Sequence, residues 1–303
     1  MPGGGCFDVG PGQFTDDTEL ALCLAYGLAG NPPSGGFPAQ AVGREYVWWA
    51  NSSEPFDIGV TTATAFSLPY GQQVADHAAA IQGNVQNAQS LASKANGALM
   101  RATPVAIWAH RLPAQAIAAA AAADARLSHP NQATQDANAA YVIAVASLIR
   151  QPGDAAAALA AAESWAAEHA CLEVQQWLAG ARDVSVMQQY QATAMIGFAK
   201  HAFQLAFYHL RQRSSFLEGL QHALLAGGDT DTNAAIVCGM LGALHGAAAI
   251  PADLRSKVES YEWTAGMPHG GSCVRPDQLR GKHLVPLAGQ LYGDAMRDAA
   301  AGQ

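Results

Sequence analysis

The stretch Thr15-Asp16-Asp17-Thr18-Glu19-Leu20-Ala21-Leu22 (residues 15–22) begins the pattern on which the fold class rests. A hydroxyl side chain and three acidic residues stand directly before an apolar run that extends to Leu28. Thr is a favourable N-cap residue, and carboxylates in the first turn interact favourably with the helix dipole. Gly30-Asn31-Pro32-Pro33 cannot continue a helix. The stretch therefore predicts a helix that starts at Thr15 and ends before Gly30.

The rest of the chain predicts further helices and no strands. Among its 303 residues 50% are hydrophobic and only 8% aromatic, because much of the apolar content is alanine, the strongest helix former. No β-alternation persists. The composition and pattern predict an all-α fold, a compact helical bundle. Helices are expected at 42–50, 61–67, 73–92, 103–125, 131–150, 154–179, 184–210, 214–226 and 231–249.

The organisation of the chain is that of one domain over residues 1–303, because no composition shift or long linker divides it. The net charge is −8, with a pI near 5.6, and the sequence contains no basic stripe. Proteins that bind nucleic acid through its phosphates normally show such a stripe. Direct nucleic-acid binding is therefore not expected.

Cysteine usage and hydropathy bear on location. The five cysteines are widely spaced and include no CxxC pair, which favours reduced thiols and a cytoplasmic location over a disulfide framework: Cys6, Cys23, Cys171, Cys238 and Cys273. The apolar run 234–250 is short for a bilayer span, so we expect a core helix and no membrane contact. Its glycines, Gly239, Gly242 and Gly246, predict that another backbone approaches closely.

Two short segments concentrate carboxylates in a chain with only 13% charged residues. One is Thr15-Asp16-Asp17, and the other is Gly227-Gly228-Asp229-Thr230-Asp231-Thr232. Each stands at the start of an expected helix, where an Asp or Thr is commonly only a cap. Adjacent carboxylates repel, however, and all-oxygen clusters suit hard divalent ions such as Mg²⁺ or Mn²⁺. On chemistry alone, capping and a two-metal site both stay open.

The first of these, extended to Phe14-Thr15-Asp16-Asp17-Thr18-Glu19-Leu20-Ala21-Leu22, and the second resemble the two signature motifs of the ADP-ribosylglycohydrolase family. Three segments between them agree with that family in the same order: Pro55-Phe56-Asp57-Ile58-Gly59, Asn96-Gly97-Ala98-Leu99-Met100-Arg101 before Pro104, and Ser128-His129-Pro130, with Ser in place of Thr. The resemblance covers about residues 3–250, and residues 251–303 are expected to extend the same domain.

The resemblance implies an all-helical fold with two Mg²⁺ or Mn²⁺ ions in a central cleft. By motif position, the metal ligands would be Thr15, Asp16, Asp17, Asp229, Asp231 and Thr232. Asp16, Asp17 and Asp57 would be the catalytic carboxylates, with Asp57 facing the ribose. Asn96, Gly97 and His129 would line the ADP-ribose site. The implied reaction is hydrolysis of the bond between ADP-ribose and a modified acceptor, in an ADP-ribosylated protein or a small ADP-ribose-containing substrate, by a chain expected to be monomeric.

One departure from the family pattern keeps an alternative open. The family's opening helix, with a Gly-Asp-Ala-Leu-Gly segment and a downstream glutamate, has no counterpart before Thr15, so we expect a bundle without that first helix. The alternative function is a catalytically weak ADP-ribose-binding protein of the same fold. A purely structural helical protein is disfavoured by the retained Asp and Thr clusters.

Overall fold

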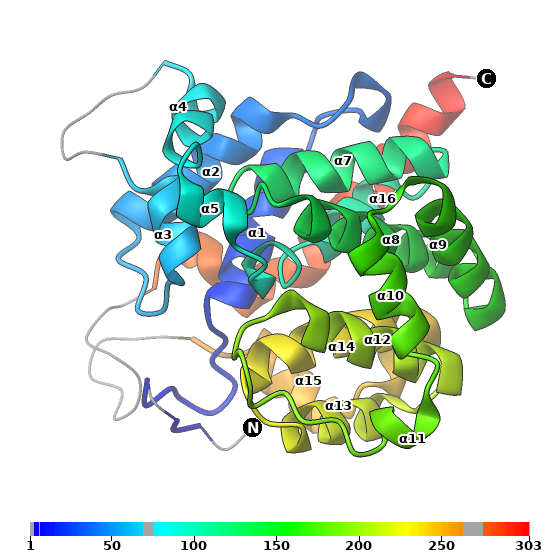
Figure 1. Cartoon of the computed structure of the whole chain (residues 1–303). Helices are drawn as coiled ribbons and strands as arrows, with labels where there is room; N and C mark the ends of the chain where they lie inside the picture. Colours follow the sequence, from blue (N-terminus) through cyan, green and yellow to red (C-terminus); the bar gives the residue numbers. More distant parts are fainter. Residues whose placement is uncertain (1–2, 6, 69–74, 263–274, 303) are drawn as a thin grey trace.

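The computed structural model describes residues 3–5, 7–68, 75–262 and 275–302, which form helices joined by short connections (Figure 1). These ranges contain no β-strand, only the isolated bridges Gly4–Val9 and Ala95–Phe198. The predicted all-α fold class is confirmed for this part of the chain. None of its helices is both long enough and apolar enough to cross a bilayer.

The α-helices of the described ranges follow one another in chain order. They are α1 (Asp16–Leu28), α2 (Ala39–Ser52), α3 (Val60–Phe66), α4 (His77–Asn84), α5 (Ala88–Ala92), α6 (Thr103–Ala109), α7 (Ala114–Arg126), α8 (Gln132–Arg150), α9 (Ala155–His169), α10 (Leu172–Gly180), α11 (Val184–Met187), α12 (Ala199–Gln212), α13 (Phe216–Leu225), α14 (Thr230–His245), α15 (Ala252–Glu259) and α16 (Leu284–Ala301). Short 3₁₀ segments lie at Pro33–Gly35, Asn96–Ala98, Ala247–Ala249, Asp277–Leu279 and Gly281–His283.

Helix α8 is the centre of the core. Every residue from Ala133 to Leu148 is buried, as expected of a helix that other helices surround on all sides. It contacts α6, α7, α9, α10, α12 and α14. Helices α1 to α5 and α7 to α9 lie in the upper part of Figure 1, and α11 to α15 in the lower part. The contact between α8 and α14 therefore joins the two parts.

Helix α14 corrects the expectation drawn from its glycines. Gly239 packs against side chains and not against a backbone, since an added Cβ would lie 2.6 Å from the Tyr141 hydroxyl oxygen. That hydroxyl donates to the Ile236 carbonyl at 2.9 Å. Nothing lies within 4 Å of the corresponding point on Gly242, and Gly246 has φ +78° just after the helix. The glycines thus make room for one buried tyrosine and end the helix.

Several expected long helices are divided. The expected helix 103–125 breaks before Pro113, whose ring and missing N–H do not suit a helix interior. The expected helix 154–179 breaks at Cys171, whose N–H donates to the Asp136 carboxylate at 2.8 Å. The expected helix 73–92 breaks before Asn87, which caps α5, and its residues 73 and 74 lie outside the described ranges. Side-chain caps and proline explain these breaks.

The expected helix 184–210 is wrong over residues 188–198, which form a loop between α11 and α12. Tertiary hydrogen bonds hold this loop. The Asn96 N–H donates to the Gly197 carbonyl at 2.8 Å, and the Ala192 N–H donates to the Ala226 carbonyl at 2.8 Å. Gly197 has φ +82°, a conformation that ends a helix and suits glycine. The loop therefore runs between the segments that begin the Asn96 and Gly227 motifs.

Candidate functional site

The first acidic segment lies at the start of α1, but it does not cap the helix as the sequence suggested. Thr15 occupies the N-cap position with extended backbone, and its side chain makes no capping hydrogen bond. Its hydroxyl lies instead 2.9 Å from Asp17 Oδ2. Asp16 and Asp17 are both buried, with 8% and 5% of their surface exposed. The buried carboxylates are therefore committed to something other than helix capping.

The second acidic segment behaves in the same way at the start of α14. Asp229 is the N-cap residue, and its side chain also makes no capping hydrogen bond. Its Oδ2 accepts from Asn96 Nδ2 at 2.7 Å. Gly227 and Gly228 have φ of +74° and +73°, which turns the chain sharply before the helix. An added Cβ on Gly228 would lie 2.1 Å from the Ala192 carbonyl oxygen, so this position admits only glycine.

The fold brings the two segments together across more than two hundred residues. Thr15 Oγ1 lies 3.2 Å from Asp231 Oδ2, 216 residues away in sequence. Thr232 Oγ1 donates to Asp17 Oδ2 at 3.4 Å. The Thr15 hydroxyl carries one proton and stands near two carboxylates, so it can donate to only one of them at a time. With Asp16, Asp57 and Asp229, whose charges act on the same site, they form a cluster of five Asp side chains with few donors among them.

Burial and mutual repulsion raise the pKa values of these carboxyl groups. The pKa of Asp16 rises to about 9, first by burial and then by the charges of Asp17, Asp57, Asp231 and Asp229. The pKa of Asp17 rises to about 7 for the same two reasons, although the Thr15 and Thr232 hydroxyls lower it. Burial also raises the pKa of Asp229. The cluster therefore strongly favours a neutralising partner, either protons or cations.

One oxygen of the cluster has no partner. Asp17 Oδ1 is buried and accepts no hydrogen bond. Among the residues that the structure describes, none of the five Asp side chains pairs with a Lys or Arg. Buried carboxylate oxygens in proteins are normally hydrogen-bonded, and an exception indicates an absent ion or water. In the same described ranges, no group of three or more His, Cys, Asp or Glu side chains is already arranged to hold a metal ion.

A cleft with a volume of about 310 Å³ opens over the cluster. Asp57, whose pKa is raised to about 6 by burial and then by Asp231, Asp229 and Glu19, lies on its wall. The full lining comprises Asp16, Asp57, Gly59, Val60, Thr61, Thr62, Ala95, Asn96, Gly97, Met100, His129, Asp229, Asp231 and Thr232. Of the residues expected in the site, only Thr15 and Asp17 are not on the cleft wall, since Asp17 lies beneath it.

The Gly97–His129 wall of the cleft is tightly packed. An added Cβ on Gly97 would lie 3.0 Å from His129 Cε1 and 3.2 Å from Thr62 Oγ1. His129 is fully buried, and burial lowers its pKa to about 3, with a smaller contribution from the Arg101 charge. Its Nδ1 lies 2.8 Å from the Ser128 hydroxyl. The imidazole is therefore neutral at physiological pH and offers a single hydrogen-bonding nitrogen to the cleft.

A buried ion pair supports this wall from behind. Arg101 Nη1 donates to the Gly97 carbonyl at 3.0 Å, and its Nε donates to Asp124 Oδ2 at 3.2 Å. The Tyr46 hydroxyl donates to the other Asp124 oxygen at 2.7 Å, and the guanidinium lies 4.6 Å from the Tyr46 ring centroid. Arg101 was part of a recognised motif, but its support of the Gly97 carbonyl was visible only in the structure.

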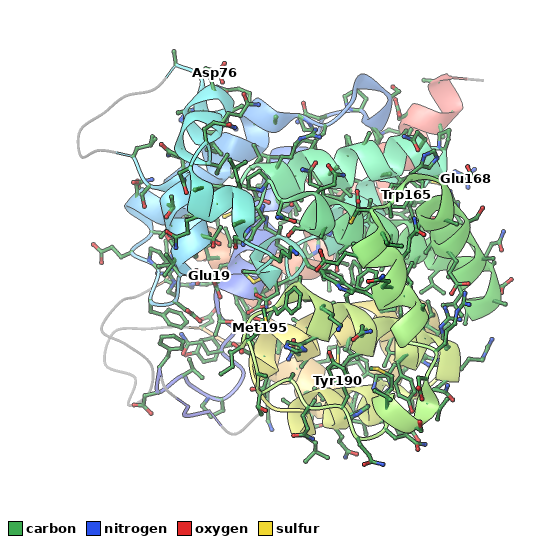
Figure 2. All side chains as sticks on the ribbon, in the orientation of Figure 1. Glu19, Asp76, Trp165, Glu168, Tyr190 and Met195 are labelled. Atoms are coloured by element: carbon green, nitrogen blue, oxygen red, sulfur yellow. The ribbon has the colours of Figure 1, made fainter. Side chains whose placement is uncertain are left out.

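Sequence reasoning missed two further groups of residues at the site. The first turn of α3, from Val60 to Thr62, lines the cleft directly after the Asp57 segment, and its position next to that segment was the available signal. Glu19 is buried at 2% exposure in the middle of the molecule, whereas Asp76 and Glu168 lie at its outer edges (Figure 2). Its partner Arg275 comes from a part of the chain that carried no motif.

These features define an all-helical protein with a carboxylate-lined cleft between its first and fourteenth helices. The family model for ADP-ribosylglycohydrolases matches residues 1–295, and the chain belongs to the ADP-ribosylglycohydrolase family. The family resemblance drawn from the sequence is thereby confirmed.

The chain is similar to two proteins whose names state an ADP-ribosyl hydrolase activity. It is 26% identical over 259 residues to the ADP-ribosyl-(dinitrogen reductase) glycohydrolase of Rhodospirillum rubrum, covering 86% of this chain and 78% of that protein. It is 38% identical over 112 residues to the ADP-ribosylarginine hydrolase Tri1 of Serratia proteamaculans, covering 36% of this chain and 28% of that one. A solved ADP-ribosylglycohydrolase-related protein has the same fold, with a TM-score of 0.69 at 22% identity, covering 98% of this chain and 87% of that one.

Proposed function

We propose that the protein is a metal-dependent hydrolase that cleaves the glycosidic bond between ADP-ribose and a modified acceptor side chain. The observation that carries this proposal is the convergence of the two acidic segments on one cleft, with Asp17 Oδ1 buried and unpartnered beneath it. Family membership and the printed activities of the Rhodospirillum and Serratia relatives support it.

The residues proposed to hold two Mg²⁺ or Mn²⁺ ions are Thr15, Asp16, Asp17, Asp229, Asp231 and Thr232. The donor set fits these ions because every ligand atom is an oxygen. Among the described residues, no Lys or Arg side chain pairs with the carboxylates. The two threonine hydroxyls already lie within hydrogen-bond distance of the carboxylates, so ligands need not all be acidic. When bound, such ions would hold ribose hydroxyls and lower the pKa of a water molecule.

Asp57 is the residue proposed to move a proton. It lies on the cleft wall, and its raised pKa of about 6 brings its carboxylate close to the pH at which a general base works best. Its Oδ atoms can accept the proton of a water that attacks the anomeric carbon. Asp16 and Asp17 are the other proposed catalytic carboxylates, since negative charge below the ribose stabilises the oxocarbenium-like transition state of glycosyl cleavage.

The opposite wall of the cleft is proposed to orient ADP-ribose. Asn96 carries an amide next to Asp229, and Gly97 lines the cleft beside His129 without adding a side chain. His129, kept neutral by burial, can make one directional hydrogen bond without adding positive charge beside the ribose. The proposed substrates are ADP-ribosylated proteins or small ADP-ribose conjugates, and the proposed location is the cytoplasm.

The test is release of ADP-ribose from arginine- and serine-ADP-ribosylated peptides, measured by chromatography with Mn²⁺ and after chelation. Wild type is expected to release ADP-ribose only with the metal, and Asp231→Asn is expected to lose release. Asp154→Asn, which changes an exposed cap of α9, is the matched control and is expected to keep activity. Tight ADP-ribose binding without release from any peptide would favour the alternative function, an ADP-ribose-binding protein. If the protein shows no binding and no release, the proposal is overturned.

A further inference from the structure

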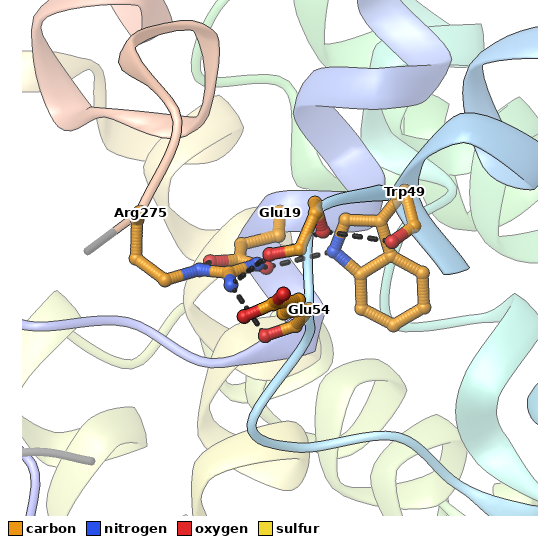
Figure 3. Close-up of polar contacts among 5 residues, drawn as sticks. Glu19, Trp49, Glu54 and Arg275 are labelled. Carbon is orange, nitrogen blue, oxygen red and sulfur yellow. Dashed lines mark hydrogen bonds and ion pairs between the residues drawn. The ribbon is translucent and has the colours of Figure 1, made fainter. Parts of the chain in front are cut away.

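Arg275 is buried, with 4% of its surface exposed, and all five of its guanidinium N–H groups are used (Figure 3). Nε and Nη2 donate to Glu19 Oε1 and Oε2 at 2.7 and 2.6 Å. Nη1 donates to the carbonyls of Ser53 and Glu54 at 2.6 and 2.8 Å. Nη2 also donates to the Ser53 hydroxyl at 3.1 Å. A guanidinium has five donors in a fixed fork, so the side chain is saturated in this one position.

The partners of Arg275 lie on two segments that each carry a carboxylate of the cleft wall. Glu19 lies on α1, one turn after Asp16, and its Oε2 also accepts from Trp49 Nε1 of α2 at 2.7 Å. Ser53 and Glu54 follow the end of α2 and lead into the segment that carries Asp57. The guanidinium carbon also lies 5.8 Å from the Phe56 ring centroid. Arg275 therefore connects the helix of Asp16 and Asp17 to the loop of Asp57.

The loop that Arg275 holds has an unfavourable backbone conformation. Glu54 has φ +51°, in the left-handed region that non-glycine residues rarely adopt. Such a residue persists when the surroundings fix it. Arg275 contacts the carbonyls on both sides of this turn, those of Ser53 and of Glu54 itself. The turn that aims the following residues toward the cleft is thus fixed by a side chain from the other end of the chain.

A general contribution to stability does not explain this arrangement well. Replacing a buried ion pair by apolar residues is often neutral or stabilising, so burial of the pair is weak evidence for a stabilising role. What this pair does that an apolar pair could not is to fix three backbone or side-chain groups of one loop at set distances from one helix. Catalytic groups lose rate when they are misplaced by about 1 Å.

We infer that Arg275, through Glu19, is a positioning residue that fixes Asp57 relative to Asp16 and Asp17. This inference rests on the proposed function, because it assigns to those three carboxylates the work described above. It also gives the segment after residue 274 a part in the site, although no residue of that segment lines the cleft. Lys cannot replace Arg275, because a single ammonium cannot form the two-pronged contact and reach both carbonyls.

The test compares Arg275→Lys with Arg255→Lys. Arg255 forms a half-buried ion pair with Glu259 on α15, so its variant matches the change without touching the cleft. For Arg275→Lys we expect kcat for ADP-ribose release to fall about tenfold or more. Hydrogen exchange of the backbone over residues 53–59 should become about tenfold faster, while exchange in α8 stays unchanged. Arg255→Lys should leave both measurements at wild-type values.

A second variant guards against a simple folding defect. Glu19→Gln/Arg275→Gln removes both charges, so no buried charge is left unpaired. We expect this variant to keep the thermal stability of wild type and still to show the lowered kcat and the faster exchange over residues 53–59. Wild-type kcat and wild-type exchange in either Arg275 variant would overturn the inference.

Failure of the proposed function is distinguishable from failure of this inference. If wild type and Arg255→Lys release no ADP-ribose, the proposed function fails. Mn²⁺ affinity, measured by calorimetry, and hydrogen exchange then still decide whether Arg275 fixes the position of Asp57 relative to Asp16 and Asp17. Unchanged Mn²⁺ affinity and unchanged exchange in Arg275→Lys would overturn the inference, and about tenfold weaker affinity with faster exchange would support it.

Discussion

Asp17→Asn is the substitution whose effect on stability can be worked out most fully. The Asp17 side chain is buried, and its pKa rises from 3.8 to about 7 because of burial and of the Asp231 charge. Below pH 3.8 the carboxyl is protonated in both the folded and the unfolded chain, so it has no effect. Between that pH and about 7, only the folded chain holds the proton, and stability without metal falls as pH rises. Above about 7 the penalty is complete.

The size of the effect follows from the two pKa values. One unit of pKa corresponds to about 1.4 kcal/mol, so the full penalty is about 4 kcal/mol, and about 2.7 kcal/mol of it develops between pH 5 and pH 7. An unfolding entropy of about 2.1 cal/mol/K per residue gives about 0.64 kcal/mol/K for this chain. Asn has nearly the same shape and does not ionise. The Tm difference between Asp17→Asn and wild type should therefore grow by about 4 °C from pH 5 to pH 8.

The assay is a thermal melt of chelator-treated protein at pH 5, 6, 7 and 8, with Asp154→Asn as the control at an exposed cap. The Asp154→Asn difference from wild type should not change with pH over this range. Added Mn²⁺ should raise the Tm of wild type at pH 8 and leave Asp17→Asn nearly unchanged. A difference between Asp17→Asn and wild type that is flat from pH 5 to pH 8 would refute the electrostatic account of the cluster.

Three further predictions follow from the walls of the cleft. Gly97→Ala places a Cβ 3.0 Å from His129 Cε1. Calorimetry should therefore show about tenfold weaker ADP-ribose binding, with Tm within about 2 °C of wild type, and unchanged affinity would contradict this. Arg101→Met leaves Asp124 buried without its cation, and urea unfolding should show a loss of about 3–5 kcal/mol; a loss below about 1 kcal/mol would show that the pair is not buried as described. Thr15→Val removes the hydroxyl between Asp17 and Asp231, so Mn²⁺ affinity should fall about tenfold. Thr61→Val, on the cleft wall with its hydroxyl 3.1 Å from Ser93 Oγ, should keep it; equal effects of the two variants would exclude a metal role for Thr15.

Local sequence chemistry was sufficient for the helical class and for the ends of many elements. Alanine-rich segments and glycine or proline breaks gave α1, α8 and α14 within a few residues. The same chemistry was insufficient for the loop at residues 188–198. That segment has no strong breaker until Gly197, and the hydrogen bonds that hold it come from Asn96 and Ala226, far away in sequence. Long-range partners of this kind override a local helical preference.

The candidate site shows the same division. The Asp and Thr pairs stood out because the chain is poor in charge, and the two segments lie together in the structure. The sequence suggested that Thr15 caps α1, whereas the structure directs its hydroxyl to Asp17 and Asp231. Glu19 belongs to the first motif, but its partner Arg275 lies 256 residues away and in no motif, so only the folded chain could reveal the pair.

Sequence also gave only part of the answer for the state of the cysteines and for the packing of helix α14. Cys23, Cys171 and Cys238 are free thiols in the structure, while Cys6 and Cys273 lie outside the described residues. The glycines of α14 predicted a close backbone neighbour, whereas Gly239 meets the side chain of Tyr141, which could not be chosen from a chain with eight tyrosines. Periodicity identifies a packed face and leaves its partner open.

Calorimetric titration of chelator-stripped protein with Mn²⁺ at pH 8 decides whether the two acidic segments bind cations. We expect binding at two sites per chain in wild type, loss of binding in Asp231→Asn, and retention in Asp154→Asn. Wild-type protein that is folded and takes up no Mn²⁺, or binds it equally in Asp231→Asn, would contradict the claim that the two acidic segments form a cation-binding site.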